Sequence, residues 1–173
     1  MKRTTMILGA TLISVVAFAP PAVAGHGGKA NGGKPDNKDQ SVESNSLTTA
    51  GKAAVSYGRG QLDRSEINTS TGSSDIHVYD KSYSATWYGL TSCTDTNWWN
   101  GLCDHYDVKF NTRTMSGLST SYWQSLGCHE LGHTGSLGHR SAGADVDNNS
   151  CMRKEIWPRS FDAHDVDAIN DNV

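Results

Sequence analysis

Alternating apolar and polar residues along the middle of the chain predict a β-sheet. In a half-buried strand every second side chain faces the core, and turn-forming residues bound the segments that have this period. The pattern predicts three strands, over residues 76–79, 85–90 and 107–111. In the last of them Val108 and Phe110 share one face, so this face is expected to meet the core.

Two later segments have the features of helices. Ser119 or Thr120 can cap a helix that runs into a histidine-rich segment, and Ser160 or Asp162 can cap a last helix through Ile169. Strands followed by helices predict an α+β fold, in which an active-site cleft divides the domain.

The N-terminal half gives weaker signals. Residues 50–66 are ambiguous, because an Ala-Ala-Val run could begin a helix that Gly58 and Gly60 interrupt. Residues 25–48 hold few large apolar side chains, so burial cannot offset the entropy that ordering would cost. We expect them to form a flexible tail or the remnant of a pro-segment, and residues 49–173 to form the domain.

The first 24 residues have the pattern of a secretory signal peptide. Lys2 and Arg3 precede an apolar run over residues 6–19 that is too short to span a bilayer comfortably, and an Ala-Val-Ala cleavage site ends at Ala24. Cleavage removes two positive charges from a chain of formal net charge −3, which argues against binding to nucleic acid or anionic lipid. We therefore expect a secreted, monomeric, single-domain protein that leaves the membrane after cleavage.

Candidate chemistry is concentrated in the segment CHELGHTGSLGH, residues 128–139. His129 and His133 are four residues apart, so on a helix they project from one face, about 40° out of register and about 6 Å apart along the axis. Both imidazoles can then reach one ion. A catalytic Zn²⁺ takes three protein ligands and keeps an open position for water, which predicts His139 as the third ligand.

The chain must turn after the helix to bring His139 back to the ion. Gly135 and Gly138 are predicted to supply this turn, because glycine adopts the left-handed backbone that ends helices at little steric cost. Glu130 points to a different side of the helix, where its carboxylate can lie over a water on the metal. The spacing therefore predicts Glu130 as a general base.

These residues resemble the signature of the metzincin metalloproteases, H-E-x-x-H-x-x-G-x-x-H followed by a methionine-containing turn. The family glycine falls at Ser136, and the family methionine corresponds to Met152, whose thioether would lie beneath the metal. Likeness to small secreted matrixin-like proteins extends to WYGLTSC at residues 87–93, to Cys128 and to AHDV at residues 163–166.

The resemblance implies a small zincin-like domain with a twisted sheet, an active-site helix and a C-terminal helix. It also implies an edge strand that pairs with an extended substrate, and a pocket wall formed by residues 152–161. Trp157 and Phe161 either line that pocket or pack in the core, while Arg153 and Lys154 meet either a substrate carboxylate or water. The implied activity is that of a secreted zinc endopeptidase, which hydrolyses a protein or peptide substrate through a metal-activated water.

Four cysteines in an exported protein most economically form two disulfides, for which three pairings exist. A bond between Cys93 and Cys103 would tether the polar loop between them, and one between Cys128 and Cys151 would fix the turn under the active helix. We favour this disulfide-stapled arrangement over a four-cysteine metal site, because the chain has no C-x-x-C pair.

Other polar clusters are weaker candidates. An oxygen-rich loop could hold calcium, although such loops are more often solvated turns; its residues are Asp145, Asp147, Asn148 and Asn149. His77, His105 and His164 lack metal-ligand spacing, so surface or hydrogen-bonding roles are expected for them.

Two other functions fit the same motif. A secreted binding protein could keep zinc for structure without catalysis, although the presence of Glu130 favours catalysis. A zinc amidase could cleave a non-peptide amide, such as one in a cell-wall polymer, because the motif does not distinguish well among amide substrates. The endopeptidase is the preferred interpretation.

Overall fold

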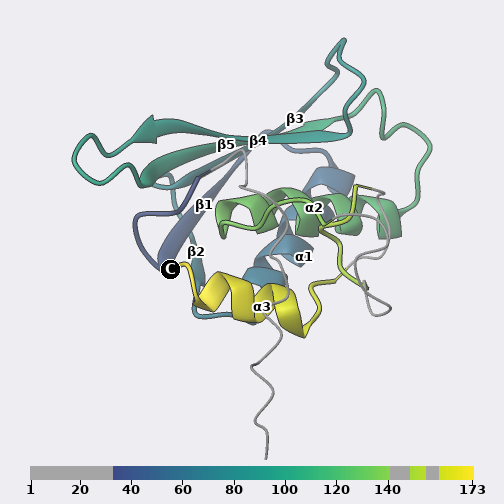
Figure 1. The fold of residues 1–173 in the computed structure, drawn as a ribbon. Coiled ribbons are helices and arrows are strands. Elements are labelled where there is room, and N and C mark those ends of the chain that lie inside the picture. The colour runs from purple at the N-terminus through teal and green to yellow at the C-terminus, as the bar shows by residue number, and fades with distance from the viewer. Residues whose placement is uncertain (1–32, 141–148, 155–159) are drawn as a thin grey trace, which may run out of the picture.

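A five-stranded twisted sheet forms one layer of the protein, and three helices lie on one side of it (Figure 1). The computed structural model describes residues 33–140, 149–154 and 160–173. The strands are β1 (Asp39–Asn45), β2 (Asn68–Thr71), β3 (Ile76–Lys81), β4 (Gly89–Thr96) and β5 (Cys103–Asn111). The helices are α1 (Thr49–Leu62), α2 (Thr120–Thr134) and α3 (Ala163–Asn170), and the predicted α+β class is confirmed.

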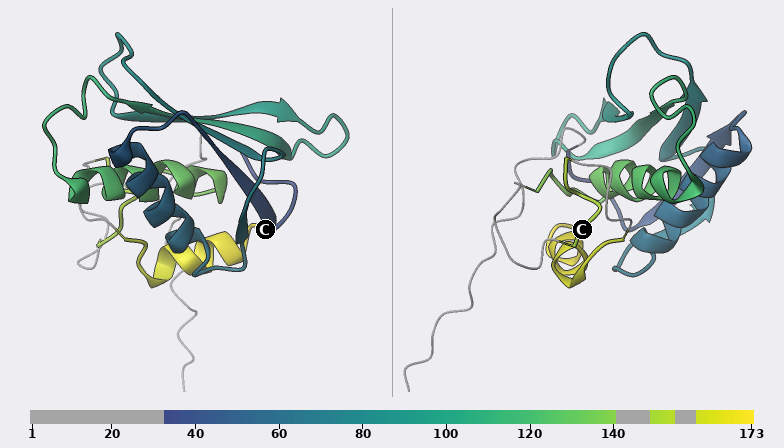
Figure 2. Two further views of the ribbon diagram at one scale, coloured as in Figure 1. Left: turned by 180° about the vertical axis from the view of Figure 1, so that it is seen from behind. Right: turned by 90° about the vertical axis from the view of Figure 1, so that its right-hand side faces the viewer.

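The sheet has the order β2-β1-β3-β5-β4, so β4 is an edge strand. The pairs of β1 with β2, β1 with β3 and β3 with β5 are parallel, whereas β4 runs antiparallel to β5. Both views in Figure 2 show the helices gathered on the same side of this sheet. The three described helices therefore cover one face of the sheet, and none of them lies on the other face.

Buried and partly exposed residues alternate along β3 and β5, and the buried ones face the helices. Ile76, Val78, Val108 and Phe110 are fully buried, and Trp123 of α2 packs edge-on against the Phe110 ring at a centroid distance of 6.3 Å. Burial of this apolar area, at about 25 cal/mol per Å², is the main force that holds the helices on the sheet. No described helix is long and apolar enough to cross a membrane.

Close packing between α1 and α2 explains Gly58, one of the two glycines that made residues 50–66 ambiguous, whereas a Cβ on Gly60 would meet nothing within 4 Å. A Cβ placed on Gly58 would lie 2.4 Å from the carbonyl oxygen of Gly127, and one on Gly127 would lie 2.0 Å from that of Ala54. The glycines allow the two helix backbones to touch, so their cost to helix propensity is offset by packing. Residues 49–62 accordingly form a helix.

The predicted strands at residues 76–79 and 107–111 are confirmed within β3 and β5. The strand predicted over residues 85–90 is wrong, because β4 begins only at Gly89. Side chains of Asn111 and Arg113 donate to four carbonyl oxygens in this segment, and these bonds replace the pairing that a strand would need; the acceptors are Tyr83, Ser84, Ala85 and Trp87.

The flexible tail predicted over residues 25–48 is wrong for its last part. Residues 39–45 form β1, which pairs with β2 on one side and with β3 on the other, and Pro35 bridges to Cys103. Only Gln40 and Val42 of this strand are buried, and the Gln40 amide is hydrogen-bonded to Thr134 of α2, so the strand packs on the helices with a single buried apolar side chain. The domain therefore begins before residue 49, and the predicted signal peptide lies outside the described residues.

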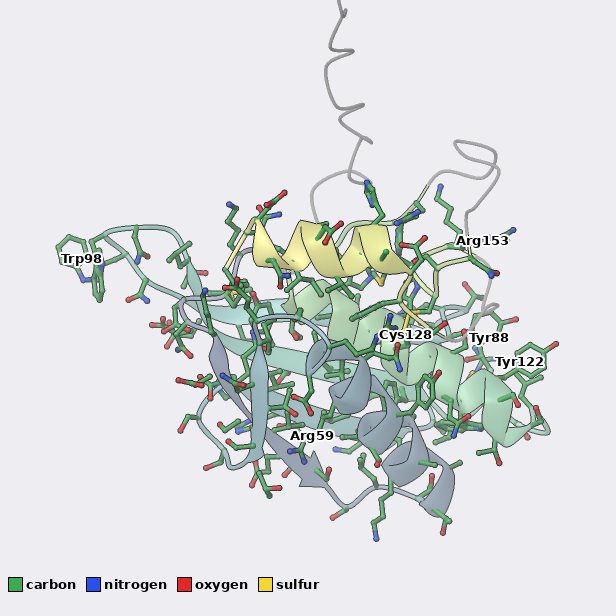
Figure 3. The ribbon with its side chains drawn as sticks, turned by 90° about the horizontal axis from the view of Figure 1, so that it is seen from below. Arg59, Tyr88, Trp98, Tyr122, Cys128 and Arg153 are labelled. Atoms are coloured by element: carbon green, nitrogen blue, oxygen red, sulfur yellow. A yellow bond between two sulfur atoms is a disulfide. The ribbon has the colours of Figure 1, made fainter. Side chains whose placement is uncertain are left out.

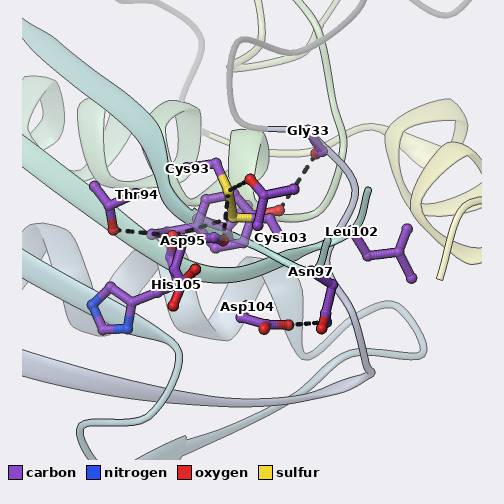
Figure 4. Close-up of a disulfide and its surroundings, with 12 residues drawn as sticks. Gly33, Cys93, Thr94, Asp95, Asn97, Leu102, Cys103, Asp104 and His105 are labelled. Carbon is purple, nitrogen blue, oxygen red and sulfur yellow. Dashed lines mark hydrogen bonds between the residues drawn. A yellow bond between two sulfur atoms is a disulfide. The ribbon is translucent and has the colours of Figure 1, made fainter. Parts of the chain in front are cut away.

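Both predicted disulfides are confirmed. Cys93 bonds to Cys103 across the β4–β5 hairpin (Figure 4), and Cys128 of α2 bonds to Cys151. The predicted helix boundaries hold as well, since Ser119 precedes α2, and Asp162 forms a capping box with Asp165 at the start of α3. The Ser119 side chain, however, makes no capping hydrogen bond.

Candidate metal centre

The turn after α2 differs from the one predicted. Gly135 ends the helix at φ −88°, and the left-handed residue is Ser136, with φ 73°. Among the described residues the left-handed glycines are Gly33, Gly101 and Gly117, so Gly135 and Gly138 do not supply the turn as we expected. The Ser136 amide donates to the His133 carbonyl and the Leu137 amide to the Gly132 carbonyl, which closes the helix.

This turn brings His139 back to the two histidines of α2. The Nε2 atoms of His129 and His139 are 3.0 Å apart, and the three imidazole centroids are separated by 4.8 to 4.9 Å. One nitrogen from each ring lies within 4.8 Å of the other two. The structure thus brings together His129, His133 and His139, the three residues predicted as metal ligands.

Backbone carbonyls fix which nitrogen of the two helical histidines faces the centre. Nδ1 of His129 is 2.7 Å from the Cys151 carbonyl oxygen, and Nδ1 of His133 is 2.7 Å from that of Leu137. A carbonyl can only accept, so each Nδ1 carries the proton and each Nε2 presents a lone pair. Metal-binding histidines are commonly oriented in this way.

Burial keeps these rings in the neutral form that binds metal. Desolvation lowers the pKa of His129 to about 3 and that of His133 to about 4, and it also lowers the pKa of the more exposed His139. In the described chain the group contains three donors of the His, Cys, Asp or Glu type and no fourth. Three neutral imidazoles with an open side fit a divalent transition metal that retains a position for water.

Glu130 is buried beside this group and contacts the edge strand. It is only 4% exposed, and the Thr91 hydroxyl of β4 lies 2.7 Å from its Oε2 and 2.8 Å from its carbonyl oxygen. Burial raises the pKa of Glu130 to about 7, and the hydrogen bond from Thr91 opposes this shift. A carboxyl group with a pKa near neutrality can both accept and release a proton at neutral pH.

Sequence reasoning missed Thr91, because it is 39 residues away from Glu130 in the chain. No local pattern marks a threonine in a strand as the partner of a carboxylate in a helix. Only the antiparallel edge position of β4, over the middle of α2, brings the two together.

Met152 lies against α2 next to the metal group. It is fully buried, and its sulfur would be 2.4 Å from a Cβ placed on Gly132, which immediately precedes His133. The neighbouring Cys151 is bonded to Cys128 and supplies the carbonyl that orients His129. The disulfide therefore connects the segment around Met152 directly to the first histidine.

Arg140 fixes the backbone beside His139, a feature that sequence reasoning also missed. Its amide donates to the Met152 carbonyl at 2.9 Å, and its guanidinium contacts Asp162 at 2.8 Å and Asp165 at 3.0 Å. Asp165 is 2% exposed, so this ion pair is shielded from water. His164, for which a surface or hydrogen-bonding role was predicted, also contacts Arg140 at 2.8 Å, and this contact is of the hydrogen-bonding kind.

A cavity of about 250 Å³ opens over the three histidines. Residues 87–91 form one wall, and Arg153 and Lys154 lie at its border. Figure 3 shows Tyr88 and Arg153 at the same end of the molecule, far from Trp98 at the tip of the β4–β5 hairpin.

Several other predicted positions can be assigned. Phe161 is 2% exposed and packs in the core, which decides between its two predicted roles. Trp157 and most of the predicted calcium loop, with Asp145, Asp147 and Asn148, lie outside the described residues.

The chain matches no protein-family model. No curated protein matches its sequence closely enough to count as a relative. The function must therefore be argued from the site itself.

Proposed function

We propose that the protein is a secreted zinc-dependent endopeptidase with a zincin-like fold, similar to the metzincins. The observation that carries the proposal is the convergence of His129, His133 and His139 beside the buried carboxyl group of Glu130. A structural zinc site is usually closed by four protein ligands, whereas three histidines with an open side are typical of hydrolytic sites.

Zinc, Glu130 and Thr91 have different roles in the proposed reaction. When bound, zinc supplies a Lewis acid that acidifies water and polarises a carbonyl group. Glu130 then takes a proton from the attacking water and delivers it to the nitrogen of the leaving amine. Thr91 holds the carboxylate in place for both transfers. This sequence of steps requires no covalent acyl-enzyme.

The edge strand β4 favours an extended peptide as substrate. Within the described chain β4 pairs only with β5, so its other edge can accept a peptide strand, and Gly89, Leu90 and Thr91 of this strand line the cavity. Main-chain pairing with such an edge holds a peptide independently of its side chains. This arrangement supports a polypeptide substrate over an amide in a cell-wall polymer.

Secretion is part of the proposal. The two disulfides are consistent with an oxidising compartment, where such bonds persist. The predicted signal peptide over residues 1–24 provides a route for export.

The test compares the purified mature protein with Glu130→Gln, using bound zinc and the cleavage of a mixed peptide library as the two readouts. We expect Glu130→Gln to retain its zinc and to lose at least about 100-fold in cleavage rate, the effect of removing a general base. Glu66→Gln is the matched control, because Glu66 is half exposed and lies in a surface ion pair.

Three outcomes would contradict the proposal. Undiminished cleavage in Glu130→Gln would exclude its role as a base. A zinc-loaded wild type that cleaves no peptide but hydrolyses cell-wall fragments would be an amidase, and one that cleaves neither would be a binding protein.

A further inference from the structure

A second group of histidines and carboxylates lies on the face of the sheet opposite the helices. His77 of β3 is directly opposite Asp107 of the neighbouring strand β5, and His105 precedes Asp107 by two residues on the same face. Their neighbours Ile76, Val78, Tyr106 and Val108 are buried on the helical side. One ligand atom from each of His77, His105 and Asp107 lies within 4.8 Å of the other two.

The hydrogen bonds of the two rings leave two lone pairs facing each other. His77 Nε2 lies 3.1 Å from the Ser73 carbonyl oxygen and 3.1 Å from a Glu43 carboxylate oxygen, so this nitrogen carries a proton. His105 Nδ1 lies 3.1 Å from the Ser74 carbonyl oxygen and must also carry one. In the neutral rings the remaining nitrogens, His77 Nδ1 and His105 Nε2, are both acceptors, and they are 3.0 Å apart.

Two acceptors at this distance repel each other unless a cation lies between or beside them. Metal–nitrogen bonds of about 2.0–2.1 Å place two tetrahedral imidazole ligands roughly 3.3 Å apart, so the observed 3.0 Å is close to a ligand spacing. A similar spacing occurs at the first site, where the outer nitrogen of His129 faces the Cys151 carbonyl and its inner nitrogen lies 3.0 Å from that of His139.

Carboxylates complete the second group. Asp107 has an oxygen within 4.8 Å of the ring nitrogens and also contacts Lys109 at 3.1 Å, while Glu43 lies opposite His77 on β1 and contacts its ring. A carboxylate that holds the outer nitrogen of a ligating histidine is a common support of metal sites. The side chains of His77 and Asp107 are 24% and 22% exposed, so water can reach the remaining coordination positions.

We infer that His77, His105 and Asp107 form a second site for a divalent transition metal, separate from the cavity over α2. Two imidazoles and one carboxylate suit zinc, nickel or copper and do not suit calcium or magnesium, which take oxygen ligands. An ion there ties β3 to β5 on the face of the sheet opposite the three described helices. Figure 4 shows the His105 ring directed away from the Cys93–Cys103 disulfide, so the bond and the site are distinct crosslinks of β5. The inference does not depend on the proposed protease activity.

A metal site at these histidines was not expected from the sequence. His77 and His105 are 28 residues apart and match no metal-binding motif, so surface or hydrogen-bonding roles were predicted for them. Parallel pairing of β3 with β5, which connects residues far apart in the chain, is what brings them together.

The experiment counts zinc ions per chain by native mass spectrometry, after the protein is equilibrated with micromolar free zinc. We expect two ions in the wild type and one in both His77→Ala and His105→Gln. The control Tyr79→Phe, on the same strand and face, should keep two, and the double variant His129→Gln/His133→Gln should keep the ion of the second site.

Thermal unfolding gives an independent readout. Zinc should raise the unfolding midpoint of the His129→Gln/His133→Gln variant, and adding His105→Gln should abolish this rise. Glu43→Gln should weaken the second site by about 10- to 100-fold without removing a ligand. No ion in the His129→Gln/His133→Gln variant, or a count that His105→Gln and His77→Ala leave unchanged, would overturn the inference and leave the two rings sharing a proton.

Discussion

Removing the Cys128–Cys151 disulfide should weaken metal binding, whereas removing the Cys93–Cys103 disulfide should not. Cys151 supplies the carbonyl that orients His129, and its bond to Cys128 holds that carbonyl against the start of the metal-binding segment. The other bond closes the β4–β5 hairpin, away from the three histidines. The double variants Cys128→Ala/Cys151→Ala and Cys93→Ala/Cys103→Ala therefore form a matched pair.

The two variants should lose similar stability. In the chain-entropy treatment a bond that spans 23 residues contributes about 3.4 kcal/mol to the free energy of unfolding, and one that spans 10 residues contributes about 2.7 kcal/mol. The two double variants should differ, however, in their affinity for zinc. Loss of the orienting partner of a ligating histidine costs about 10- to 100-fold in affinity. The Cys151→Ala change keeps the backbone carbonyl but removes the bond that holds it against His129, so a loss of affinity up to this size is expected in Cys128→Ala/Cys151→Ala alone.

The assay titrates zinc into each variant against a competing chelator, in a His105→Gln background so that only one site is counted. Urea denaturation of the same samples gives the loss of stability. Equal affinities in the two variants, or a loss confined to Cys93→Ala/Cys103→Ala, would refute the role assigned to the Cys151 carbonyl.

Three further predictions concern the turn, the histidines and the arginine. Ser136→Gly should raise the free energy of unfolding by up to about 1 kcal/mol in urea denaturation, because glycine relieves the left-handed strain at φ 73°; a loss of stability would contradict this. The folded pKa values of His129 and His133, about 3 and 4, lie below the unfolded value of 6.5, so the unfolded chain binds more protons as the pH falls. Zinc-free protein should therefore lose roughly 3 kcal/mol of stability between pH 7.5 and pH 5.5, and a flat profile in chelator would be inconsistent with buried neutral rings. Arg140→Met should cost roughly 3 kcal/mol, because it leaves Asp165 buried without its cation, and should also weaken zinc binding at His139; unchanged zinc affinity would show that Arg140 does not position this ligand.

Local patterns were sufficient to predict the features that depend on neighbouring residues. The four-residue spacing of His129 and His133 places both rings on one helical face. The prediction that His139 lies next to them requires only a short turn after the helix. Both disulfides were also predicted from neighbouring residues. Cys93 and Cys103 lie on either side of one polar loop, and Cys128 and Cys151 directly precede His129 and Met152.

Features that depend on sheet pairing were missed. Strand β1 is polar enough to be taken for a tail, yet it lies between two parallel partners. The contact of Thr91 with Glu130 and the pairing of His77 with His105 arise in the same way, because strand order is not encoded in any short segment. The turn at Ser136 was misassigned because we placed left-handed backbone on the available glycines.

The most direct test of the central claim is an anomalous difference map of crystals of the zinc-loaded protein, recorded at the zinc absorption edge. The account predicts a peak bonded to nitrogens of His129, His133 and His139 at about 2.0–2.1 Å, with water or substrate in the fourth position next to Glu130. A peak bound by only two of these histidines, or one closed by a fourth protein ligand, would contradict it.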